Sequence, residues 1–352
     1  MRKSRQISIG DVKIGGGDPV SVQSMTITDT RDVPSTVSQI KRLKNAGCDI
    51  VRVAVPDMDA AKSLGSIRKQ INIPLVSDIP FDYRLALESI RQGVHGMRIN
   101  PGNIGARYRI KAVVDACGER SVPIRIGVNS GSLEKDILRK YGSPTAEALV
   151  ESAMRHVHIL EDLNFTDIKI SVKSTDVRKM ITAYRMLAER IEYPLHLGVT
   201  EAGTPTMGTV KSSIGIGALL AEGIGDTIRV SLTGDPVEEI VVGMNILKSL
   251  GIRNKGIELI SCPGCGRLEI DLEKLVSEVE RGVSGFNLER PVKVAILGCV
   301  VNGPGEASEA DIGIAGGRGK GMLYRDGKLV KSFRETDLVG ELVKEIERNF
   351  VN

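Results

Sequence analysis

The stretch Pro123-Ile124-Arg125-Ile126-Gly127-Val128-Asn129 is short and rich in apolar, β-branched residues. Such a run is typical of a buried strand in a parallel sheet. Seven further runs of this kind occur in the first 235 residues, separated by helical patterns. The eight runs span residues 20–25, 50–55, 74–78, 96–100, 123–129, 167–172, 195–200 and 227–232. Eight alternating strand and helix units predict a (β/α)8 barrel, the TIM barrel.

The segments between these runs carry helical signals. Residues 36–46 have apolar side chains at helical spacing, and Gly47 follows as a helix C-cap. The alternative to a barrel is a doubly wound sheet, which usually has fewer strands and a phosphate-binding glycine loop after the first one. Gly15-Gly16-Gly17 precedes the first strand, and Gly215-Ile216-Gly217 lacks the third glycine of that loop. The pattern therefore favours the barrel.

A second, smaller domain is predicted beyond the barrel, so that the two domains span residues 1–253 and 254–352. Its strands are expected at 257–260, 292–297 and 312–314, with a hairpin of 322–324 and 328–330 turning at Asp326-Gly327. Helices are expected at 271–281 and from Asp337 onward. This pattern is typical of a small α/β domain.

The composition excludes several classes of function. With 41% hydrophobic and 26% charged residues the chain is an ordinary globular protein. A net charge of +4, 3% aromatic residues and no Trp give no reason to expect a nucleic-acid partner. The N-terminus lacks the apolar segment of a signal peptide, and no apolar stretch is long enough to span a membrane. We expect a cytoplasmic protein.

Charged and polar residues stand at the predicted carboxyl ends of the barrel strands, where TIM barrels place their active sites. They are Arg52, Asp78, Arg98 with Asn100, Arg125 with Asn129, Lys173, Glu201, and Arg229 with Ser231. Five strands that end in Arg or Lys predict an anionic ligand, because guanidinium groups offer forked donors to phosphate. The alternative is a ring of internal salt bridges to Asp78, Glu201 and Asp226, but the cations outnumber these acids.

Glu201 is the one acid among basic and small residues at a strand end. A carboxylate in that position predicts a proton donor or base, and the alternative is that it only positions an arginine. His196 lies in the middle of a strand and is expected to be a core residue. His156 and His158 lie on a helix and are expected at the surface.

Three of the five cysteines lie in the predicted C-terminal domain. Cys262-Pro263-Gly264-Cys265 follows one strand directly, and Cys299 follows another. Soft thiolates select zinc or iron–sulfur clusters, and a structural zinc site normally closes with a fourth Cys or a His. Since neither is nearby, the three cysteines predict a [4Fe–4S] cluster with one special iron, completed by a weaker ligand or by the substrate. Glu306 is the available oxygen donor. Structural zinc is the alternative.

Stretches throughout the chain match one known family. They are residues 22–26, 49–53, 98–103, 125–133, 151–156, 197–203 and 223–232, and the most specific is Gly298-Cys299-Val300-Val301-Asn302-Gly303-Pro304-Gly305-Glu306. On these motifs the chain resembles the 4-hydroxy-3-methylbut-2-enyl diphosphate synthases of the non-mevalonate isoprenoid pathway, in their two-domain bacterial form. The resemblance covers nearly the whole chain.

The resemblance implies a reaction, which is the two-electron reductive ring opening of 2-C-methyl-D-erythritol 2,4-cyclodiphosphate to hydroxymethylbutenyl diphosphate and water. It also implies a [4Fe–4S] cluster on Cys262, Cys265, Cys299 and Glu306, with flavodoxin or ferredoxin as the electron donor. It further implies a C-terminal module like that of sulfite and nitrite reductases. Finally, it implies a homodimer that places one subunit's cluster over the other subunit's barrel.

The implied roles of the site residues follow from this reaction. We expect the cyclic diphosphate to bind Arg52, Asp78, Arg98, Arg125, Asn129, Lys173, Arg229 and Ser231. Glu201 is expected to protonate the departing hydroxyl, and Glu306 to release one iron to the substrate.

One departure from the family is visible. The family commonly has Asp-Ile-His-Phe where this chain has Asp78-Ile79-Pro80-Phe81, which puts any role of that histidine in doubt. Two rival interpretations stay open at this stage. One is a non-redox barrel enzyme of the dihydropteroate synthase type with a zinc-stapled appendage, and the other is a non-catalytic iron–sulfur sensor.

Overall fold

The chain forms two compact units in the computed structural model, Met1–Arg253 and Asn254–Asn352. The structure describes residues 2–253, 256–268, 270–286, 288, 290–317 and 319–351, without the side chain of Pro101. Within these ranges no helix combines the length and the apolar character needed to cross a membrane. That the first unit binds substrate and the second a cluster stays a prediction.

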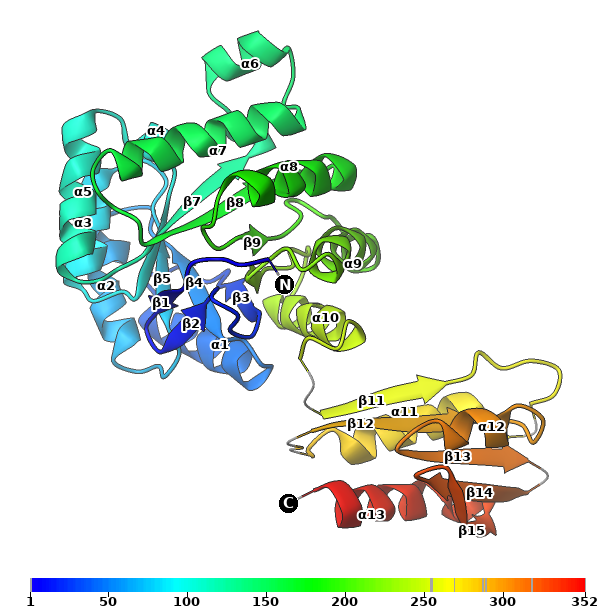
Figure 1. Ribbon diagram of the computed structural model, residues 1–352. Coiled ribbons are helices and arrows are strands. Elements are labelled where there is room, and N and C mark those ends of the chain that lie inside the picture. The colour runs from blue at the N-terminus through cyan, green and yellow to red at the C-terminus, as the bar shows by residue number, and fades with distance from the viewer. Residues whose placement is uncertain are drawn as a thin grey trace. The chain divides into compact units, whose positions relative to one another are not determined.

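The first unit contains an eight-stranded parallel barrel (Figure 1). Its neighbouring strands follow the order β8-β7-β6-β5-β4-β3-β10-β9, and a bridge from Ile170 to Leu195 joins β8 to the chain just before β9. The strands are β3 (Ser21–Met25), β4 (Ile50–Ala54), β5 (Leu75–Asp78), β6 (Gly96–Ile99), β7 (Ile124–Asn129), β8 (Ile168–Lys173), β9 (His196–Leu197) and β10 (Thr227–Ile228). The predicted TIM barrel is confirmed, although its last two strands are only two residues long.

Helices cover the outside of the barrel. They are α1 (Val33–Asn45), α2 (Met58–Arg68), α3 (Tyr83–Arg91), α4 (Pro101–Ile104), α5 (Arg107–Glu119), α6 (Lys135–Tyr141), α7 (Ala146–Glu161), α8 (Val177–Arg190), α9 (Pro205–Ala221) and α10 (Pro236–Ser249). Many begin at a side-chain cap that accepts a backbone N–H, as at Asp32, Asp57, Asp82, Thr145, Asp176 and Asp235. Such caps fix where each loop at the carboxyl end of the barrel stops.

A hairpin that the sequence analysis did not predict closes the amino end of the barrel. Strands β1 (Ile7–Ile9) and β2 (Val12–Ile14) pair in antiparallel fashion. The side chains of Ile7, Ile9 and Ile14 pack against Ile50 and Val76, which lie near the starts of β4 and β5. The amino end is therefore filled by apolar side chains, and the polar residues lie toward the carboxyl end.

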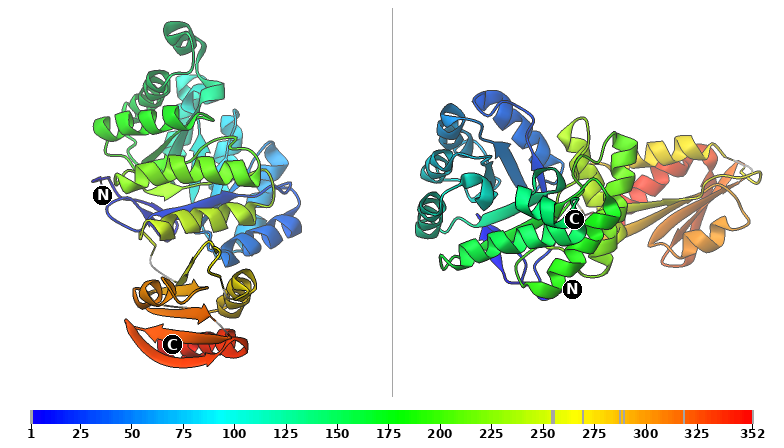
Figure 2. Two further views of the ribbon diagram at one scale, coloured as in Figure 1. Left: turned by 90° about the vertical axis from the view of Figure 1, so that its right-hand side faces the viewer. Right: turned by 90° about the horizontal axis from the view of Figure 1, so that it is seen from above.

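The second unit is one mixed sheet with helices on both faces (Figure 2). Its strands run in the order β11 (Gly256–Ser261), β12 (Pro291–Leu297), β13 (Ile312–Gly317), β14 (Lys320–Arg325) and β15 (Lys328–Arg334). The first three are parallel, and β14 and β15 are antiparallel additions. Helices α11 (Leu272–Val283) and α13 (Leu338–Phe350) pack on one face, and the short α12 (Gly303–Ser308) packs on the other. The predicted α/β architecture is confirmed.

Candidate active site

A cavity of about 110 Å³ lies at the carboxyl ends of the barrel strands. It is lined by Arg52, Asp78, Arg98, Arg125, Asn129, Ser171, Lys173, Thr200, Arg229 and Ser231. Alternate strand residues point into a barrel, whereas their neighbours, such as Ile126 and Val172, pack in the surrounding core. The structure thus brings together all eight residues that are expected to bind the substrate. Their role as ligands stays a prediction.

Asp78 holds two of the cations in this cavity. One of its carboxylate oxygens lies 3.1 Å from Arg98 Nη1, and the other lies 3.5 Å from Arg52 Nε. Arg98 also donates to the carbonyl of Gly127 at 3.1 Å. Burial alone would raise the pKa of the Asp78 carboxyl, but the charges of Arg52, Arg98 and Arg125 outweigh it, so the pKa is lowered. Asp78 is therefore an anion that positions arginines.

The cations of the cavity lack enough counter-charge. Five cations but only one acid line it. Burial, together with the like charges of Arg229 and Arg98, lowers the pKa of Arg52 to about 10 against the opposing effect of Asp78. Burial and the nearby arginines also lower the pKa of Lys173 well below its usual value. A bound polyanion would supply the missing charge and reverse these shifts.

The alternative of a closed ring of internal salt bridges does not account for this excess. Asp226 lies outside the cavity lining, where it contacts Arg2 and accepts a hydrogen bond from Ser4. Glu201 is exposed and also does not line the cavity.

The sequence analysis missed Glu239, a buried acid beside the cavity. It lies in the first turn of α10, and one carboxylate oxygen accepts a hydrogen bond from Ser24 Oγ at 3.2 Å and lies 3.6 Å from Arg229 Nη2. The other oxygen accepts from the backbone N–H of Leu232 at 3.0 Å. Glu239 therefore fixes Arg229 and the chain after β10. An acid in the first turn of a helix is a common feature, so nothing in the sequence distinguishes Glu239 from other such acids.

Glu201 lies in the loop between β9 and α9, immediately after the cavity-lining Thr200. Its backbone has a φ of 50°, in the left-handed region, which costs a non-glycine residue roughly 1–2 kcal/mol. Non-glycine residues in such conformations cluster at functional sites. The structure therefore places Glu201 next to the cavity but not in its wall.

Two of the histidines are buried, one as expected and one against the prediction. His196 is fully buried, as expected, and burial lowers its pKa well below the usual value, so it is a neutral core group. The prediction that His156 lies at the surface is wrong. His156 is buried on the inner face of α7, where its Nε2 lies 3.0 Å from Glu134 Oε1. Ser152, one helical turn earlier, donates to the other oxygen of Glu134 at 2.7 Å.

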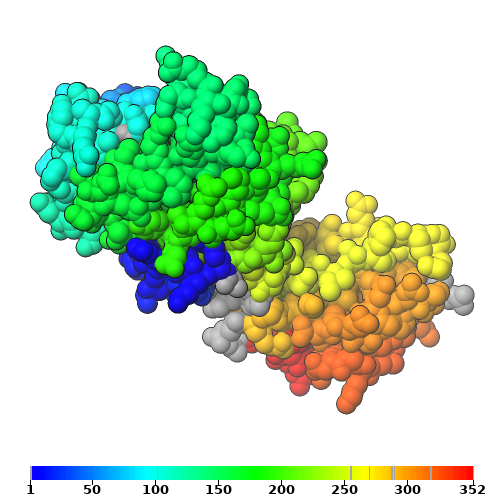
Figure 3. Space-filling model, turned by 45° about the horizontal axis from the view of Figure 1, so that its top comes forward, coloured from blue at the N-terminus to red at the C-terminus, as the bar shows by residue number. Residues whose placement is uncertain are grey.

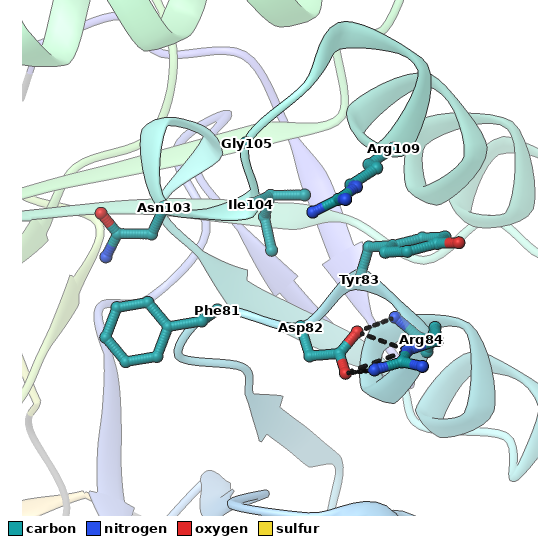
Figure 4. A pocket seen from close by; sticks show the side chains of 8 residues that line it. All are labelled: Phe81, Asp82, Tyr83, Arg84, Asn103, Ile104, Gly105 and Arg109. Atoms are coloured by element: carbon teal, nitrogen blue, oxygen red, sulfur yellow. Dashed lines mark hydrogen bonds and ion pairs between the residues drawn. The ribbon is translucent and has the colours of Figure 1, made fainter.

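A second, larger cavity of about 530 Å³ lies among the loops and helix starts that follow β5 and β6. Its lining consists of Phe81, Asp82, Tyr83, Arg84, Asn103, Ile104, Gly105 and Arg109. Figure 4 shows Asp82 bonded to Arg84, and Arg109 beside the ring of Tyr83, 5.7 Å from its centre. The first residue of this lining, Phe81, directly follows Pro80, the position where the chain departs from the family. None of the predicted site residues line it.

The predicted cluster ligands lie at one edge of the second sheet. Cys262 directly follows β11, and Cys299 comes two residues after the end of β12. The two strands are parallel neighbours, with Ser261 opposite Ile296, so their carboxyl ends meet at this edge. Glu306 lies on α12, and both Glu306 and Cys265 are exposed. Within the described ranges, no three Cys, His, Asp or Glu side chains are close enough to hold a metal ion.

The chemistry of this edge nevertheless fits an iron–sulfur cluster. The pKa of the Cys299 thiol is lowered, chiefly by the backbone N–H groups of Asn302 and Val301. Slight desolvation opposes this effect, and Gly303 and the charge of Arg267 add to it. Such donors stabilise a thiolate ligand and tune a cluster. Metal binding commonly gathers ligands that are apart without it. The remaining cysteines are unsuited, because burial raises the pKa of both Cys48 and Cys117 to about 12.

Fold and site together define a class of protein, which is a TIM barrel with a buried cationic mouth, joined to a small α/β unit that bears three cysteines at one sheet edge. Two family models match this chain. The GcpE TIM-barrel domain matches residues 4–244, and the GcpE protein C-terminal domain matches residues 258–348. The chain belongs to the GcpE family.

Curated relatives match over nearly their full length. A protein of Clostridium perfringens (strain 13 / Type A), named 4-hydroxy-3-methylbut-2-en-1-yl diphosphate synthase (flavodoxin), is 62% identical over 346 residues, which cover 98% of this chain and 99% of the relative. A protein of the same name from Geobacter sulfurreducens is 58% identical, covering 98% of both chains.

Among solved structures, dihydropteroate synthase from Stenotrophomonas maltophilia has a TM-score of 0.52 at 13% identity, covering 70% of this chain and 98% of that one. At this identity the likeness shows the barrel fold alone.

Proposed function

We propose that this chain is a flavodoxin-dependent 4-hydroxy-3-methylbut-2-enyl diphosphate synthase, an iron–sulfur oxidoreductase of isoprenoid precursor biosynthesis. One observation carries the proposal: the chain is 62% identical to the Clostridium perfringens enzyme of that name over 98% of its length. The reaction opens 2-C-methyl-D-erythritol 2,4-cyclodiphosphate. It consumes two electrons and two protons and yields the linear hydroxymethylbutenyl diphosphate and one water.

The barrel mouth supplies the electrostatic part of this reaction. The diphosphate binds in the cavity on Arg52, Arg98, Arg125, Lys173 and Arg229, while Asn129 and Ser231 add hydrogen bonds. Asp78 orients Arg52 and Arg98. As the ring's C–O bond breaks, negative charge moves onto the diphosphate, and donors already fixed around it stabilise that charge without rearranging. The neighbours Ser171 and Thr200 lie in the same wall.

Glu201 delivers a proton to the departing hydroxyl, which then leaves as water. Its exposure is consistent with a group that exchanges protons with solvent between turnovers. The left-handed backbone at Glu201 supports the role as well, because strain of this kind is retained mainly where a side chain must be held in one direction.

Cys262, Cys265 and Cys299 would hold a [4Fe–4S] cluster, with Glu306 as the exchangeable fourth ligand. When bound, the cluster supplies electrons one at a time. Glu306 lies on the helix that follows Cys299, with its side chain exposed. A carboxylate is a weaker ligand of iron than a thiolate, so Glu306 would be the most readily exchanged of the four ligands. Flavodoxin or ferredoxin supplies the electrons to this edge.

We further infer a homodimer in which one subunit's cluster domain completes the other subunit's barrel site. Exposed apolar side chains support it on both sides. On the barrel they follow the ends of β3, β5 and β6, at Ile27, Phe81 and Tyr108. On the second unit Val300 and Val301 are exposed directly after Cys299. Apolar side chains that gather around two sites are typical of surfaces that become covered.

Mixed dimers test this arrangement. Glu201→Gln removes the proton donor of a barrel site and Cys299→Ala removes a cluster, so each variant alone loses nearly all turnover. If the site is shared, coexpressed subunits form mixed dimers with one intact pair, and about a quarter of the wild-type activity returns. If each chain works alone, no activity returns.

The proposed function as a whole is tested by an anaerobic assay of the reconstituted protein with the cyclodiphosphate and a strong one-electron reductant. Iron and sulfide are measured in the same sample. Turnover with roughly four irons per chain supports substrate, cofactor and reaction together. Zinc in place of iron would contradict the redox chemistry. We also propose a cytoplasmic location, where such thiols stay reduced.

A further inference from the structure

Charge is strongly segregated within the second unit. Residues 254–352 contain 14 Lys and Arg against 16 Asp and Glu, so the unit is slightly acidic. Residues 320–334, which form the β14–β15 hairpin, contain five of these cations and only one acid. The hairpin therefore carries a net charge of +4 within a unit whose remainder is acidic. Such local asymmetry produces a positive field that the net charge of the unit conceals.

The hairpin is open to solvent. β15 is the last strand of its sheet, and all but one of its residues are exposed. Its exposed cations are Lys328, Lys331 and Arg334, and Lys320 on β14 is exposed as well. Figure 3 shows this part of the chain, in orange to red, on the surface of the unit. A long edge strand invites pairing with another strand, but its lysines oppose such pairing.

The side chains of two of these cations lie on the face of the sheet against which α12 packs. Lys320 and Arg334 lie directly opposite each other across β14 and β15. The next pair, Gly321 and Phe333, faces α13, since a Cβ on Gly321 would meet Leu338 and Phe333 packs against the core of that face. Successive strand residues alternate between faces. Lys320 and Arg334 therefore point to the opposite face, where α12 packs.

The same two cations lie at the cysteine-bearing edge of the sheet. β13 runs parallel to β12, and its last residue, Gly317, lies opposite Lys320. The carboxyl ends of β11, β12 and β13 and the Lys320 end of the hairpin therefore form one edge. Lys328 lies at the other end of the hairpin, opposite Arg325 and six residues from Arg334. That separation is roughly 20 Å along an extended strand.

We propose that the Lys320 and Arg334 end of this hairpin is the docking surface for an acidic one-electron carrier protein of the flavodoxin class. The inference rests on the proposed function, because it identifies where the electron donor of that reaction binds. Each turnover consumes two electrons, and each flavodoxin hydroquinone gives up one and becomes a semiquinone. Two carriers must therefore dock and leave in every cycle.

Exposed charges suit such brief encounters. Complementary charge raises the rate of association without building a long-lived interface, and electron-transfer interfaces are small. Arg334 and Asp337 form an ion pair at 3.1 Å, and both side chains are exposed. Replacing Asp337 in this pair by a carboxylate of the carrier therefore costs little free energy. The position at the cysteine edge places the carrier beside the loops that would hold the cluster.

The test uses the full-length reconstituted protein under anaerobic conditions. The double variant K320E/R334E is compared with K328E, which reverses a charge at the far end of the same hairpin. Binding of a bacterial flavodoxin is measured by calorimetry, and turnover is measured with flavodoxin and, separately, with reduced methyl viologen. We expect the double variant to raise both the Kd and the KM for flavodoxin roughly tenfold or more, with unchanged viologen-driven turnover. K328E should change either value less than about threefold.

Several results would overturn this docking surface. They are an unchanged Kd in the double variant, an equal effect of K328E, or a change of oligomeric state with an unchanged Kd, which would assign the surface to a second copy. If the double variant loses its cluster, K320Q/R334Q removes the charges without reversing them and is judged by the same Kd. Absent viologen-driven turnover in the wild type would instead contradict the proposed function, while the flavodoxin Kd still decides the docking.

Discussion

At the mouth of the barrel, five cations are already gathered around one cavity, whereas at the edge of the second sheet three cysteines and a glutamate share an edge without converging. The cations of the mouth are held by two acids, Asp78 and Glu239, and stand on hydrogen-bonded strands of one barrel. The cysteines follow their strands in exposed or half-buried loops.

The difference follows from what each site has to overcome. Like charges repel each other, so a cationic cavity persists without its ligand only on a rigid frame, and the barrel provides one. Thiols repel little while they are protonated, so they can remain apart until a metal gathers them. The mouth is thus pre-organised, and the edge is assembled by what it binds. Substitutions at the barrel mouth should weaken substrate binding, and substitutions at the cysteine edge should prevent the cluster from binding.

The largest effect is expected from Cys299→Ala. This variant removes a predicted ligand whose thiol pKa is lowered by backbone donors. We expect loss of bound iron and sulfide and loss of all turnover, with substrate affinity within about twofold of wild type, because the barrel mouth is built without it. Iron analysis and calorimetry with the cyclodiphosphate check both halves. A full complement of iron would show that cluster binding at this sheet edge does not require the Cys299 thiol.

Glu201→Gln should abolish turnover by a different route. The amide keeps the shape of the side chain but delivers no proton, so the hydroxyl cannot leave as water. We expect turnover to fall by roughly a hundredfold or more, in line with the loss of a general acid, while the substrate Kd and the iron content stay unchanged. Single-turnover kinetics under anaerobic conditions measure it. Undiminished turnover would show that Glu201 is not the general acid.

Arg125→Met should separate affinity from stability at the mouth. Removing a charged hydrogen-bond donor from a bound phosphate costs about 2–3 kcal/mol, which is roughly 30- to 150-fold in Kd. Arg125 is buried among like charges, and burial first, then Arg52 and Arg98, lower its pKa well below the usual value. The ligand-free variant should therefore melt at a higher temperature than wild type. A lower melting temperature with unchanged affinity would contradict a ligand-binding role.

The sequence predicted the mouth well because strand ends of a barrel must meet. Eight β-branched runs predict a barrel, and the topology of a barrel alone brings Arg52 on β4 and Lys173 on β8 to one cavity. Glu239 escaped notice because it comes from a helix, where an acid in the first turn is ordinary. The β1–β2 hairpin escaped because its strands are three residues long. His156 was misplaced because only the packing of α7 shows which of its faces is buried.

The smallest expected effect concerns a loop of the mouth. Glu134 follows Asn129 in the loop after β7 and is fixed by His156 and Ser152 on α7. Burial would raise its pKa, but the close contact with the His156 ring and the hydrogen bond from Ser152 outweigh this and lower it from 4.5 to about 2. Since the folded pKa is below the ordinary one, the ionised carboxylate stabilises the fold above about pH 4.5. That stabilisation is lost as the pH falls toward 2.

Glu134→Gln keeps the size of the side chain and removes the charge, so its cost should depend on pH. At pH 7 we expect a loss of about 1–2 kcal/mol in the free energy of unfolding, at the low end for a hydrogen bond to a charged group because Glu134 is only partly buried. Near pH 3 the difference from wild type should be clearly smaller, because the wild-type carboxylate is then closer to protonation. Urea unfolding of both proteins at the two pH values measures it. An equal difference at both pH values would mean that the charge of Glu134 does not hold this loop.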